Sequence, residues 1–515
     1  MTDLLLVNPG NSKGIYQDLS NKYSAVEPPT WALLLAKSCL SKNYKVKILD
    51  CNAESLDNFS ALEEIKKINP KLICFVVYGQ NVNSGTTNMS GAISLLNYLK
   101  NNNFDVPVAF IGSHVQALPV ETLKKEKNID FVFTNEGVYA LWNVLALKKI
   151  SKDNLSNIKG IAFLHKNKVI FNEPEKIVPN ERMDIDLPGY AWELLPYKKS
   201  PLDLYRSPMW HAEYKEENRS PYAAIQTSLG CQFKCSFCMI NIINRNDKDE
   251  IGVASQYSKM RHWSPNFIIK EFKKLISLGV KTIKITDEMF LLNPKYYIPL
   301  CEKLSEINKD DSLRLWAYSR IDTVKRPEIL KMVRKAGIRW LALGIESGDK
   351  DIRLEVSKGK FEDVDVRKIV KQIHDSDIEI MANYIFGLPG DNHESMEKTF
   401  ELSKELCTSG WNTYAAMALP GSRLYKLAIE KNFKLPDNYE GFSFHSYNTQ
   451  PLPTDHLEPH EILSYRDQCY INYHRSEKFI QRISSKYGED AANNILEMSK
   501  VKLKRKIIEE AEKNL

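Results

Sequence analysis

The chain has 515 residues, too many for one ordinary hydrophobic core, and its 43% hydrophobic and 10% aromatic content predicts a soluble globular protein of two or three domains. No run approaches the roughly 18 apolar residues that a membrane span requires, and the N-terminus lacks the pattern of a secretion signal, so we expect a cytoplasmic protein. A net charge of +6, from 71 basic and 65 acidic residues, gives little support to nucleic-acid binding.

Residues 1–150 alternate short apolar runs with helical patterns, which predicts an α/β domain with a doubly wound, Rossmann-like parallel sheet. The expected strands are 4–7, 44–50, 71–79, 107–113 and 130–137. Ligands bind such sheets at the carboxyl ends of the strands. The loops expected there are rich in glycine and small polar residues, so a large ligand could approach the backbone closely, although simple turn chemistry explains them equally well: 8–14, 79–85 and 112–114.

The pattern weakens over residues 151–215, which we interpret as a linker with a possible hairpin at 160–172. Over 216–430 the alternation resumes with six expected strands, at 222–227, 281–286, 313–319, 339–345, 378–387 and 412–419. Six strand–helix units predict a partial or full barrel of the triosephosphate isomerase (TIM) kind, (β/α)6 in the partial form, with chemistry on the loops that follow the strands. Residues 431–515 are expected to be mostly helical.

Three of the nine cysteines lie within eight positions in LGCQFKCSFCMIN, directly after the first barrel strand: Cys231, Cys235 and Cys238. Such short spacing lets three thiolates converge, and soft thiolates select zinc, copper(I) or an iron–sulfur cluster. A structural zinc would normally have a fourth protein ligand, but the nearest histidines are at least twenty residues away. A [4Fe-4S] cluster with three cysteine ligands is the better explanation, because its fourth iron is then free to bind a substrate.

This triplet, with an aromatic residue (Phe237) before its last cysteine, resembles the signature of the radical S-adenosylmethionine (SAM) superfamily. The resemblance implies that the open iron chelates the amino and carboxylate groups of SAM. It also implies that an electron from the cluster cleaves SAM to methionine and a 5'-deoxyadenosyl radical.

The ends of the second and third barrel strands strengthen the resemblance. ITDEMF places Asp287 and Glu288 where the family usually has an acidic residue for the SAM amino group. YSRID supplies Arg320, whose guanidinium suits the SAM carboxylate because it can bind it bidentately. The alternative is that these charged groups form a salt-bridge network at the barrel rim.

The next two strand ends also resemble the family. LGIESGDK implies Glu346 and Ser347 as contacts of the SAM ribose and carboxylate, and Gly387 lies in NYIFGLPG, which is similar to the adenine-side motif. Glu346 in a rim ion pair and Gly387 as a turn residue are the alternatives. Tyr318, Tyr384 and Tyr414, near strand ends, are candidates for lining a cavity, but core packing explains each of them equally well.

An N-terminal sheet before such a barrel resembles the cobalamin-dependent branch of the superfamily, through segments 27–40, 111–123 and 130–141. The loop NPGNSKG lacks the aspartate and histidine of the DxHxxG cobalamin motif. The resemblance therefore implies cobalamin without a lower protein ligand, or a domain that has lost the cofactor. His114 is expected to form a hydrogen bond and not to ligate cobalt. The expected corrin contacts are Asn8, Gln80, Asn81, Ser84, Gly112, Ser113 and His114.

The resemblance implies an enzyme with a [4Fe-4S] cluster, SAM and cobalamin, most often a methyltransferase that acts on an unactivated carbon or phosphorus of a small molecule. Cyclisation, rearrangement or oxidation with the same cofactors is an alternative, and a cofactor sensor without turnover is a more distant one. A ferredoxin or flavodoxin is the expected electron donor. The sequence assigns no catalytic residue and no substrate.

Overall fold

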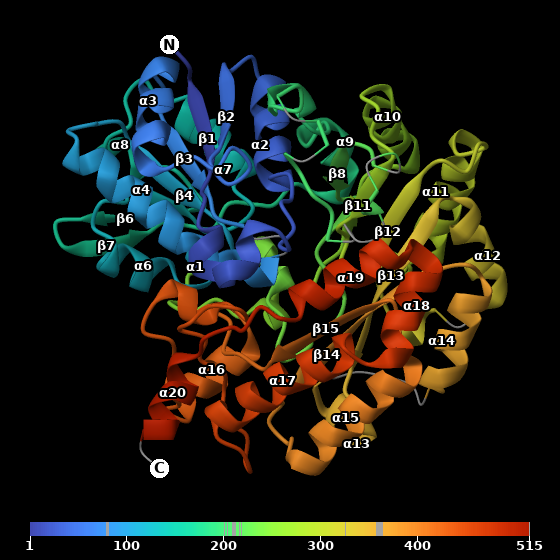
Figure 1. Ribbon diagram of the computed structural model, residues 1–515. Coiled ribbons are helices and arrows are strands. Elements are labelled where there is room, and N and C mark those ends of the chain that lie inside the picture. The colour runs from blue at the N-terminus through green and yellow to red at the C-terminus, as the bar shows by residue number, and fades with distance from the viewer. Residues whose placement is uncertain are drawn as a thin grey trace.

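The computed structural model describes residues 1–78, 82–199, 201–202, 204–208, 213–215, 217, 219–324, 326–356 and 364–513. Two mainly parallel sheets stand side by side with helices on their faces, and a group of C-terminal helices packs below both (Figure 1). The expectation of two α/β units followed by helices is confirmed. No helix in the described part of the chain is long and apolar enough to cross a membrane.

The first sheet contains the five predicted strands in the order β2-β1-β3-β4-β5, all parallel: β1 (Leu4–Asn8), β2 (Val46–Asp50), β3 (Ile73–Val76), β4 (Val108–Ile111) and β5 (Phe131–Phe133). Alternate residues of each strand face opposite layers, because side chains in a strand point to the two faces in turn. Leu4 and Leu6 pack in one core with α2 (Thr30–Leu40) and α7 (Val138–Leu145), and Leu5 and Val7 pack in the other core. The doubly wound sheet is therefore confirmed.

The other face of this sheet is covered by α3 (Asn58–Ile68), α4 (Met89–Asn101) and α6 (Pro119–Lys125). The predicted hairpin forms as β6 (Ile161–His165) and β7 (Lys168–Phe171). Its first strand pairs antiparallel with β5, so the sheet has seven strands and continues into the region that the sequence assigned to a linker. The hairpin covers the edge of β5, which would otherwise leave its backbone groups unpaired.

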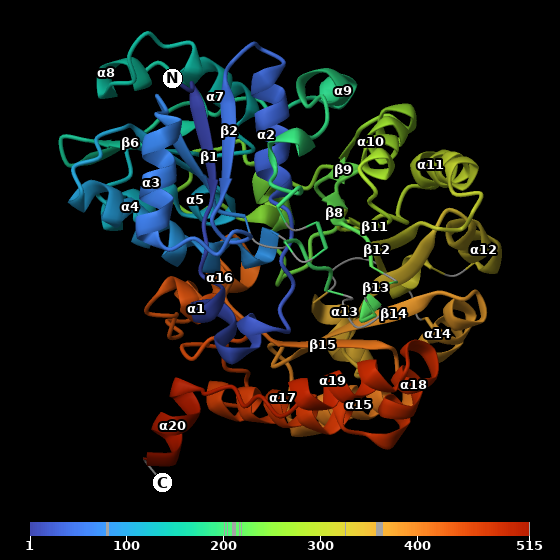
Figure 2. The same ribbon diagram turned by 45° about the horizontal axis from the view of Figure 1, so that its top comes forward.

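The second sheet contains the six predicted strands, all parallel, in the order β8-β11-β12-β13-β14-β15: β8 (Tyr222–Ile225), β11 (Thr282–Ile285), β12 (Arg314–Arg320), β13 (Ile338–Glu346), β14 (Glu379–Phe386) and β15 (Gly410–Ala415). Its edge strands β8 and β15 do not pair with each other. The sheet is thus a curled half-barrel, and the partial form of the predicted barrel is the one observed (Figure 2).

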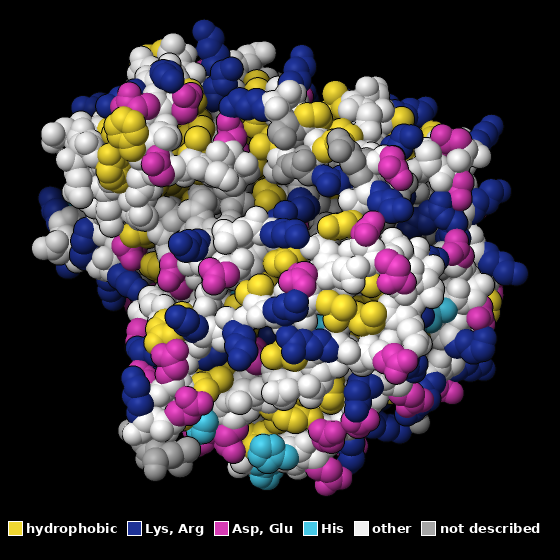
Figure 3. All heavy atoms as spheres, viewed as in Figure 1, with side chains coloured by type: hydrophobic (Ala, Val, Ile, Leu, Met, Phe, Trp, Pro, Cys, Tyr) yellow, Lys and Arg dark blue, Asp and Glu magenta, His cyan; other side chains and the backbone are white. Residues whose placement is uncertain are grey.

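The half-barrel carries its helices on the outer face: α10 (Pro265–Ser277), α11 (Pro294–Ile307), α12 (Pro327–Lys335), α14 (Val366–Asp375) and α15 (His393–Leu406). Shorter elements connect the main ones: α1 (Ser12–Tyr16), α5 (Ser113–Ala117), α8 (Lys152–Leu155), α9 (Met183–Asp186), β9 (Ser228–Leu229), β10 (Arg261–His262), α13 (Lys350–Val356) and α16 (Arg423–Glu430). Basic and acidic side chains are interspersed on the face of the molecule that Figure 3 shows, as the small net charge predicts.

The C-terminal region is helical, as predicted: α17 (Pro459–His474), α18 (Glu477–Tyr487), α19 (Glu489–Met498) and α20 (Lys506–Lys513). The chain before α17 also reaches back to the first domain. The Tyr439 hydroxyl donates to Glu126 over 2.8 Å, and the Ser443 hydroxyl donates to the carbonyl of Ile15 over 2.9 Å. The C-terminal region therefore contacts both sheets and helps to enclose the space between them.

Candidate active site

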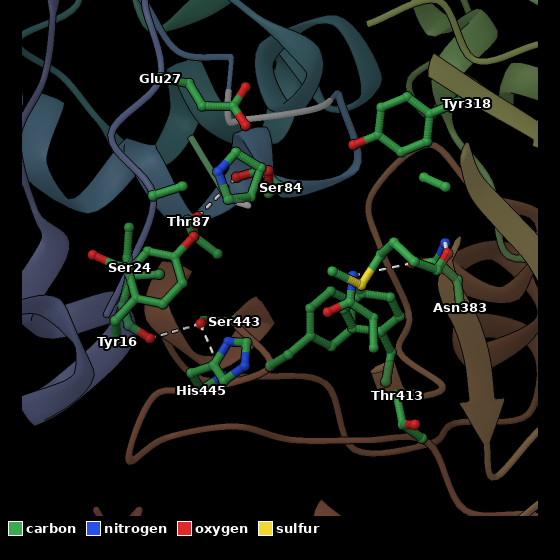
Figure 4. A pocket seen from close by; sticks show the side chains of 18 of the residues that line it. Tyr16, Ser24, Glu27, Ser84, Thr87, Tyr318, Asn383, Thr413, Ser443 and His445 are labelled. Atoms are coloured by element: carbon green, nitrogen blue, oxygen red, sulfur yellow. Dashed lines mark hydrogen bonds between the residues drawn. The ribbon is translucent and has the colours of Figure 1, made fainter. Parts of the chain in front are cut away.

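One cavity of about 560 Å³ lies where the first domain, the lumen of the half-barrel and the C-terminal region meet. Figure 4 shows its two sides: Tyr16, Ser24, Glu27 and His445 on one side, and Tyr318, Asn383 and Thr413 on the other. All three cysteines of the triplet are part of its wall. The carboxyl ends of both sheets therefore open into the same space, where ligands of such sheets are expected.

The cysteine loop follows β8 and β9 and is held by a short 3-10 helix, η7 (Ile240–Asn244). The side-chain oxygen of Asn241 accepts a hydrogen bond from the Cys231 backbone N–H over 2.8 Å, and the Phe233 N–H donates to the Cys231 sulfur over 3.4 Å. Burial raises the pKa of Cys231 to about 11 and that of Cys235 to about 12, and it raises the pKa of Cys238 as well. Only bound iron or another strong electrophile would keep these three groups as thiolates at neutral pH.

The donor set fits a cluster better than a single ion. In the described part of the chain, no group of three or more His, Cys, Asp or Glu side chains is arranged around one metal position. In a [4Fe-4S] cluster each cysteine binds a different iron, so the sulfurs stand apart around a larger object. Three cysteines on one loop, in the wall of a cavity, match that requirement.

Two adjacent carboxylates after β11 have different environments. Asp287 is buried and accepts from the Thr227 N–H and hydroxyl (2.5 and 2.6 Å) and from the Ser228 hydroxyl (2.6 Å). It does not line the cavity, so its role is to join the end of β8 to the end of β11. Glu288 is half-buried in the cavity wall, and burial raises its pKa to about 7, although Lys284 partly opposes the shift.

Arg320, at the end of β12, lies in the cavity wall against the cysteine loop. Its guanidinium stacks on the ring of Phe233 at 3.7 Å, and its Nε and Nη2 donate to the two carboxylate oxygens of Asp322 over 2.6 Å each. The rim ion pair that the sequence left open exists, but its acidic partner is Asp322 and not Asp287. The pair fixes a positive charge beside Cys235 and Glu346, whose ionised forms it favours.

Glu346 ends β13 in a left-handed backbone conformation, with φ of +65°, at an irregularity in the pairing of β13 with β14. This conformation costs energy for a residue other than glycine and is frequent at functional sites. Gly344 has no side chain there, and a Cβ atom on it would collide with the Glu346 carboxylate. The local backbone thus directs the carboxylate into the cavity wall, where burial raises its pKa to about 7 against the opposing effect of Arg320.

Ser347 and Gly387 lie close to the cavity in sequence but do not line it. The Ser347 hydroxyl is fully buried, pairs with the Thr399 hydroxyl at 3.2 Å and accepts from the Asp349 N–H over 3.1 Å. Gly387 has φ of +75°, and a Cβ atom there would lie 2.7 Å from Ile462 of α17. Both residues therefore shape the loops and the packing of α17 around the site.

In the first domain, the expected corrin contacts separate into different groups. Asn8 and Ser84 are in the cavity wall, and Asn8 also donates to the buried Asp50 over 2.7 Å. Gln80 and Asn81 lie outside the described residues. Of the three tyrosines, Tyr318 and Tyr414 line the cavity, and Tyr384 packs in the hydrophobic core.

The turn after β4 is tightly packed against the end of β3. A Cβ atom on Gly112 would collide with the carbonyl of Val77, and one on Gly85 would lie 2.9 Å from the same carbonyl. Ser113 is fully buried. His114 is also buried, its Nδ1 lies 3.2 Å from the Thr86 hydroxyl, and burial lowers its pKa to about 3. Gly112, Ser113 and His114 do not line the cavity, and the hydrogen bond of His114 is made with Thr86, so the corrin contacts expected of these three residues stay predictions.

Several wall residues were not found from the sequence. Tyr16 and His445 come from α1 and the C-terminal region, and their rings pack at 5.5 Å. Lys284 of β11 forms a buried ion pair with Glu27. Lys284, which alternates with the buried Ile283 and Ile285 in KTIKIT, was a local signal in the sequence. Tyr16 and His445 are brought together by long-range packing and had no such signal.

Comparison with known proteins agrees with this geometry. Residues 225–403 match the model of the radical SAM superfamily, and residues 17–145 match the model of the B12 binding domain. The first match begins at the end of β8 and includes the cysteine loop, and the second covers most of the first sheet. The chain therefore belongs to the cobalamin-dependent radical SAM enzymes.

Individual relatives share most of this architecture. Over 468 residues the chain is 26% identical to the uncharacterized methyltransferase PH0819 of Pyrococcus horikoshii, covering 90% of this chain and 91% of that protein. It is 22% identical to an anaerobic magnesium-protoporphyrin IX monomethyl ester cyclase of Cereibacter sphaeroides, over 82% of this chain and 62% of the cyclase. The fold matches the cobalamin-dependent SAM radical enzyme OxsB, solved with aqua-cobalamin and SAM, at a TM-score of 0.64 and 13% identity, over 97% of this chain and 72% of OxsB.

Proposed function

We propose that this protein is a methyltransferase that transfers a methyl group to an unactivated carbon, or to phosphorus, of a small molecule. The observation that carries the proposal is the single cavity onto which both the cysteine loop and the strand ends of the first domain open. Methyl transfer requires the methyl donor, the radical source and the substrate at one place, and a shared cavity supplies that proximity. The similarity to a methyltransferase over nine-tenths of the chain supports the same reaction.

Cys231, Cys235 and Cys238 would hold the [4Fe-4S] cluster, and Glu288, Arg320 and Glu346, which line the cavity, would contact SAM. When bound, cluster and SAM supply a 5'-deoxyadenosyl radical, and methylcobalamin supplies the methyl group. Glu288 and Glu346 would accept hydrogen bonds from the amino and ribose groups. The three residues predicted as SAM contacts that do not line the cavity, Asp287, Ser347 and Gly387, act through the loops that they hold.

Cobalamin would lie against the first domain, on the side chains of Asn8 and Ser84 and on the packed turns of Gly85 and Gly112. The tight packing of these turns against Val77, which leaves no room for a side chain on Gly85 or Gly112, supports this placement. Gln80 and Asn81 remain proposed contacts on the basis of their position in the sequence. His114 is not proposed as a cobalt ligand, because its ring is engaged by Thr86 outside the cavity wall.

The lumen of the half-barrel suits a substrate with an apolar or aromatic body. Trp316, Tyr318, Met381 and Tyr414 face it, with Asn383 as a hydrogen-bonding group. These inward positions follow from the alternation of β12, β14 and β15. We further propose a cytoplasmic location and a ferredoxin or flavodoxin as the reductant.

An anaerobic assay tests the proposal. The chain is reconstituted with iron, sulfide and cobalamin, and is then incubated with a reductant and SAM that carries a labelled methyl group. We expect release of 5'-deoxyadenosine and methionine, and transfer of the label to cobalamin. Cys238→Ala should abolish the release, and Cys301→Ala, which removes a buried thiol on α11 away from the site, is the matched control. A reconstituted protein that does not cleave SAM would refute the enzyme assignment.

The similarity to a ring-forming cyclase makes cyclisation the second candidate. The two reactions differ in the fate of the label, because a cyclase would leave it on methionine. Product mass decides between them: methylation adds one CH2 unit to the substrate, and ring formation does not.

A further inference from the structure

A buried salt bridge joins the first domain to the half-barrel inside the cavity wall. Lys284 Nζ lies 2.6 Å from Glu27 Oε1, and the two side chains are only 3% and 6% exposed. Glu27 belongs to the loop before α2 in the first domain, and Lys284 belongs to β11. Both residues line the cavity, and Figure 4 shows Glu27 extending toward it across from Tyr318.

The barrel holds the ammonium group in a fixed place. Lys284 is the register partner of Trp316 on β12, so the two side chains share the inner face of the half-barrel. Its Nζ lies 4.9 Å from the ring of Trp316 and 5.3 Å from that of Tyr318, both within the range of a cation–π contact. The two rings constrain the rotamer of Lys284, so its ammonium group points toward Glu27.

A second buried ion pair joins the same two parts of the protein at another point. Arg261 Nη2 lies 2.7 Å from Glu136 Oε2, and both side chains are essentially inaccessible. Glu136 follows β5 of the first domain, and Arg261 belongs to β10, which pairs with the strand before the cysteine loop. Two separate attachment points restrict rotation of one domain on the other, which a single point would permit.

Such pairs matter more for geometry than for net stability. Removing charges from water costs about as much as the pair regains, so a buried ion pair contributes little stability, but separation of its partners is strongly unfavourable. Any movement of the first domain away from the lumen would leave Glu27 and Lys284 as unpaired buried charges. The pair therefore penalises changes in the separation of the two domains.

We propose that Glu27 and Lys284 are positioning residues that hold the first domain at one distance from the barrel lumen. This inference rests on the proposed function, because the quantity that it fixes is the separation between the cobalamin and cluster sites. The pair acts on the relative placement of the two cofactors and forms no bond to the reacting atoms.

The separation can be measured by electron paramagnetic resonance, because a reduced [4Fe-4S] cluster and cob(II)alamin each carry an unpaired electron. The dipolar coupling between the two spins in the reconstituted protein reports their distance. We expect a single narrow distance in the unmodified protein and a broadened distribution in Lys284→Met and Glu27→Gln. Lys248→Met is the matched control: it breaks a different, solvent-exposed ion pair between the same parts, in which Lys248 is 45% and Glu173 is 67% exposed, and it should leave the distribution narrow.

Amide hydrogen exchange gives a second readout that requires neither cofactor. The loop of residues 24–31 should exchange roughly 100-fold faster in Lys284→Met, because the variant leaves Glu27 as an uncompensated buried charge. If that single variant does not fold, the double variant Glu27→Gln/Lys284→Met removes both charges and should fold while still broadening the distance distribution.

The outcomes separate the two proposals. An unchanged distance distribution and unchanged exchange at residues 24–31, in the single or the double variant, would overturn the positioning role. If the unmodified protein binds no cluster or no cobalamin, the proposed function fails. The exchange measurement then still decides whether the pair holds the two domains together.

Discussion

The two sides of the cavity are built on different principles. The half-barrel presents ionisable side chains at successive strand ends: the cysteines after β8, Glu288 after β11, Arg320 at the end of β12 and Glu346 at the end of β13. The first domain presents mainly neutral polar and aromatic side chains, such as Asn8, Ser84 and Tyr78, and its carboxylate Glu27 is paired with Lys284. A cluster and SAM need charged ligands, whereas a large neutral ring system needs a closely fitting surface.

The difference predicts how strongly the replacement of a residue on each side should affect ligand binding. A ligand on the barrel side acts through one atom at one place, so its replacement should affect a single binding step. A residue on the first-domain side acts through shape, and its neighbours share the contact. The largest effects are therefore expected on the barrel side and the smallest on the first-domain side.

Replacing a cysteine of the triplet should have the largest effect. Cys238→Ala removes one of three proposed iron ligands. Loss of a hydrogen-bonding partner of a metal ligand typically lowers metal affinity or activity by roughly 10- to 100-fold, and loss of a ligand itself should lower them further. We expect reconstituted protein with little iron and sulfide and no measurable 5'-deoxyadenosine. Iron content of Cys238→Ala equal to that of Cys301→Ala would contradict the assignment.

The next effect distinguishes two neighbouring carboxylates. Glu288→Gln should weaken SAM binding by about 10- to 150-fold, because a hydrogen bond to a charged group contributes roughly 1.5–3 kcal/mol, and it should not lower the free energy of unfolding. Asp287→Asn should lower the free energy of unfolding and leave SAM affinity nearly unchanged. It leaves one of the donors on Thr227 or Ser228 unpaired, which costs about 1–3 kcal/mol of unfolding free energy.

Equilibrium binding of SAM and urea unfolding of the two variants, measured side by side, check this pair of predictions. Equal loss of SAM affinity in both would show that Asp287 contacts SAM directly or that Glu288 does not.

The sequence predicted the architecture well because it is set by local pattern. All eleven expected strands form, since runs such as KLICFVVYG and RWLALGI are apolar enough to be buried wherever they lie. The hairpin at 160–172 was also predicted, but its position at the edge of the first sheet was not. Pairing of β6 with the edge of β5 depends on which strand is left uncovered, and that is a property of the assembled sheet.

The sequence predicted the kind of site and the strand ends that form it, but not all of the side chains that line it. Cys231, Cys235, Cys238, Glu288 and Glu346 line the cavity because their positions follow from strand ends. Which of two adjacent carboxylates faces the cavity depends on donors from β8, and the sequence does not show that Thr227 and Ser228 take Asp287. The C-terminal wall was not predicted, because its contacts join residues more than 400 positions apart.

A smaller effect is expected from the pH dependence of the barrel side. The pKa of Glu346 is about 7 in the folded chain and 4.5 as its ordinary value, because burial disfavours the charge. Below pH 4.5 the group is protonated in both states, and as pH rises toward 7 the unfolded chain releases the proton first. The contribution to stability is thus fully present at low pH and lost as pH rises through about 7.

Glu346→Gln removes this pH-dependent contribution to the free energy of unfolding. In cluster-free protein, the unfolding free energy of the variant should exceed that of the parent by about 1–3 kcal/mol at pH 8, and the difference should vanish near pH 4.5. Urea unfolding of both proteins from pH 4.5 to pH 8 measures the difference. A difference that does not change with pH would show that folding does not raise the pKa of Glu346.

The smallest effect should come from His114 on the first-domain side. His114→Asn removes a neutral imidazole that is paired with Thr86 and lies outside the cavity wall, at a cost of about 1 kcal/mol of unfolding free energy. Cobalamin affinity should change by no more than a few-fold, and the spectrum of bound cob(II)alamin should lack nitrogen splitting in both the parent and the variant. Nitrogen splitting that disappears in the variant would identify His114 as a cobalt ligand, and the first domain would then bind its cofactor as the barrel does, through one atom of one side chain.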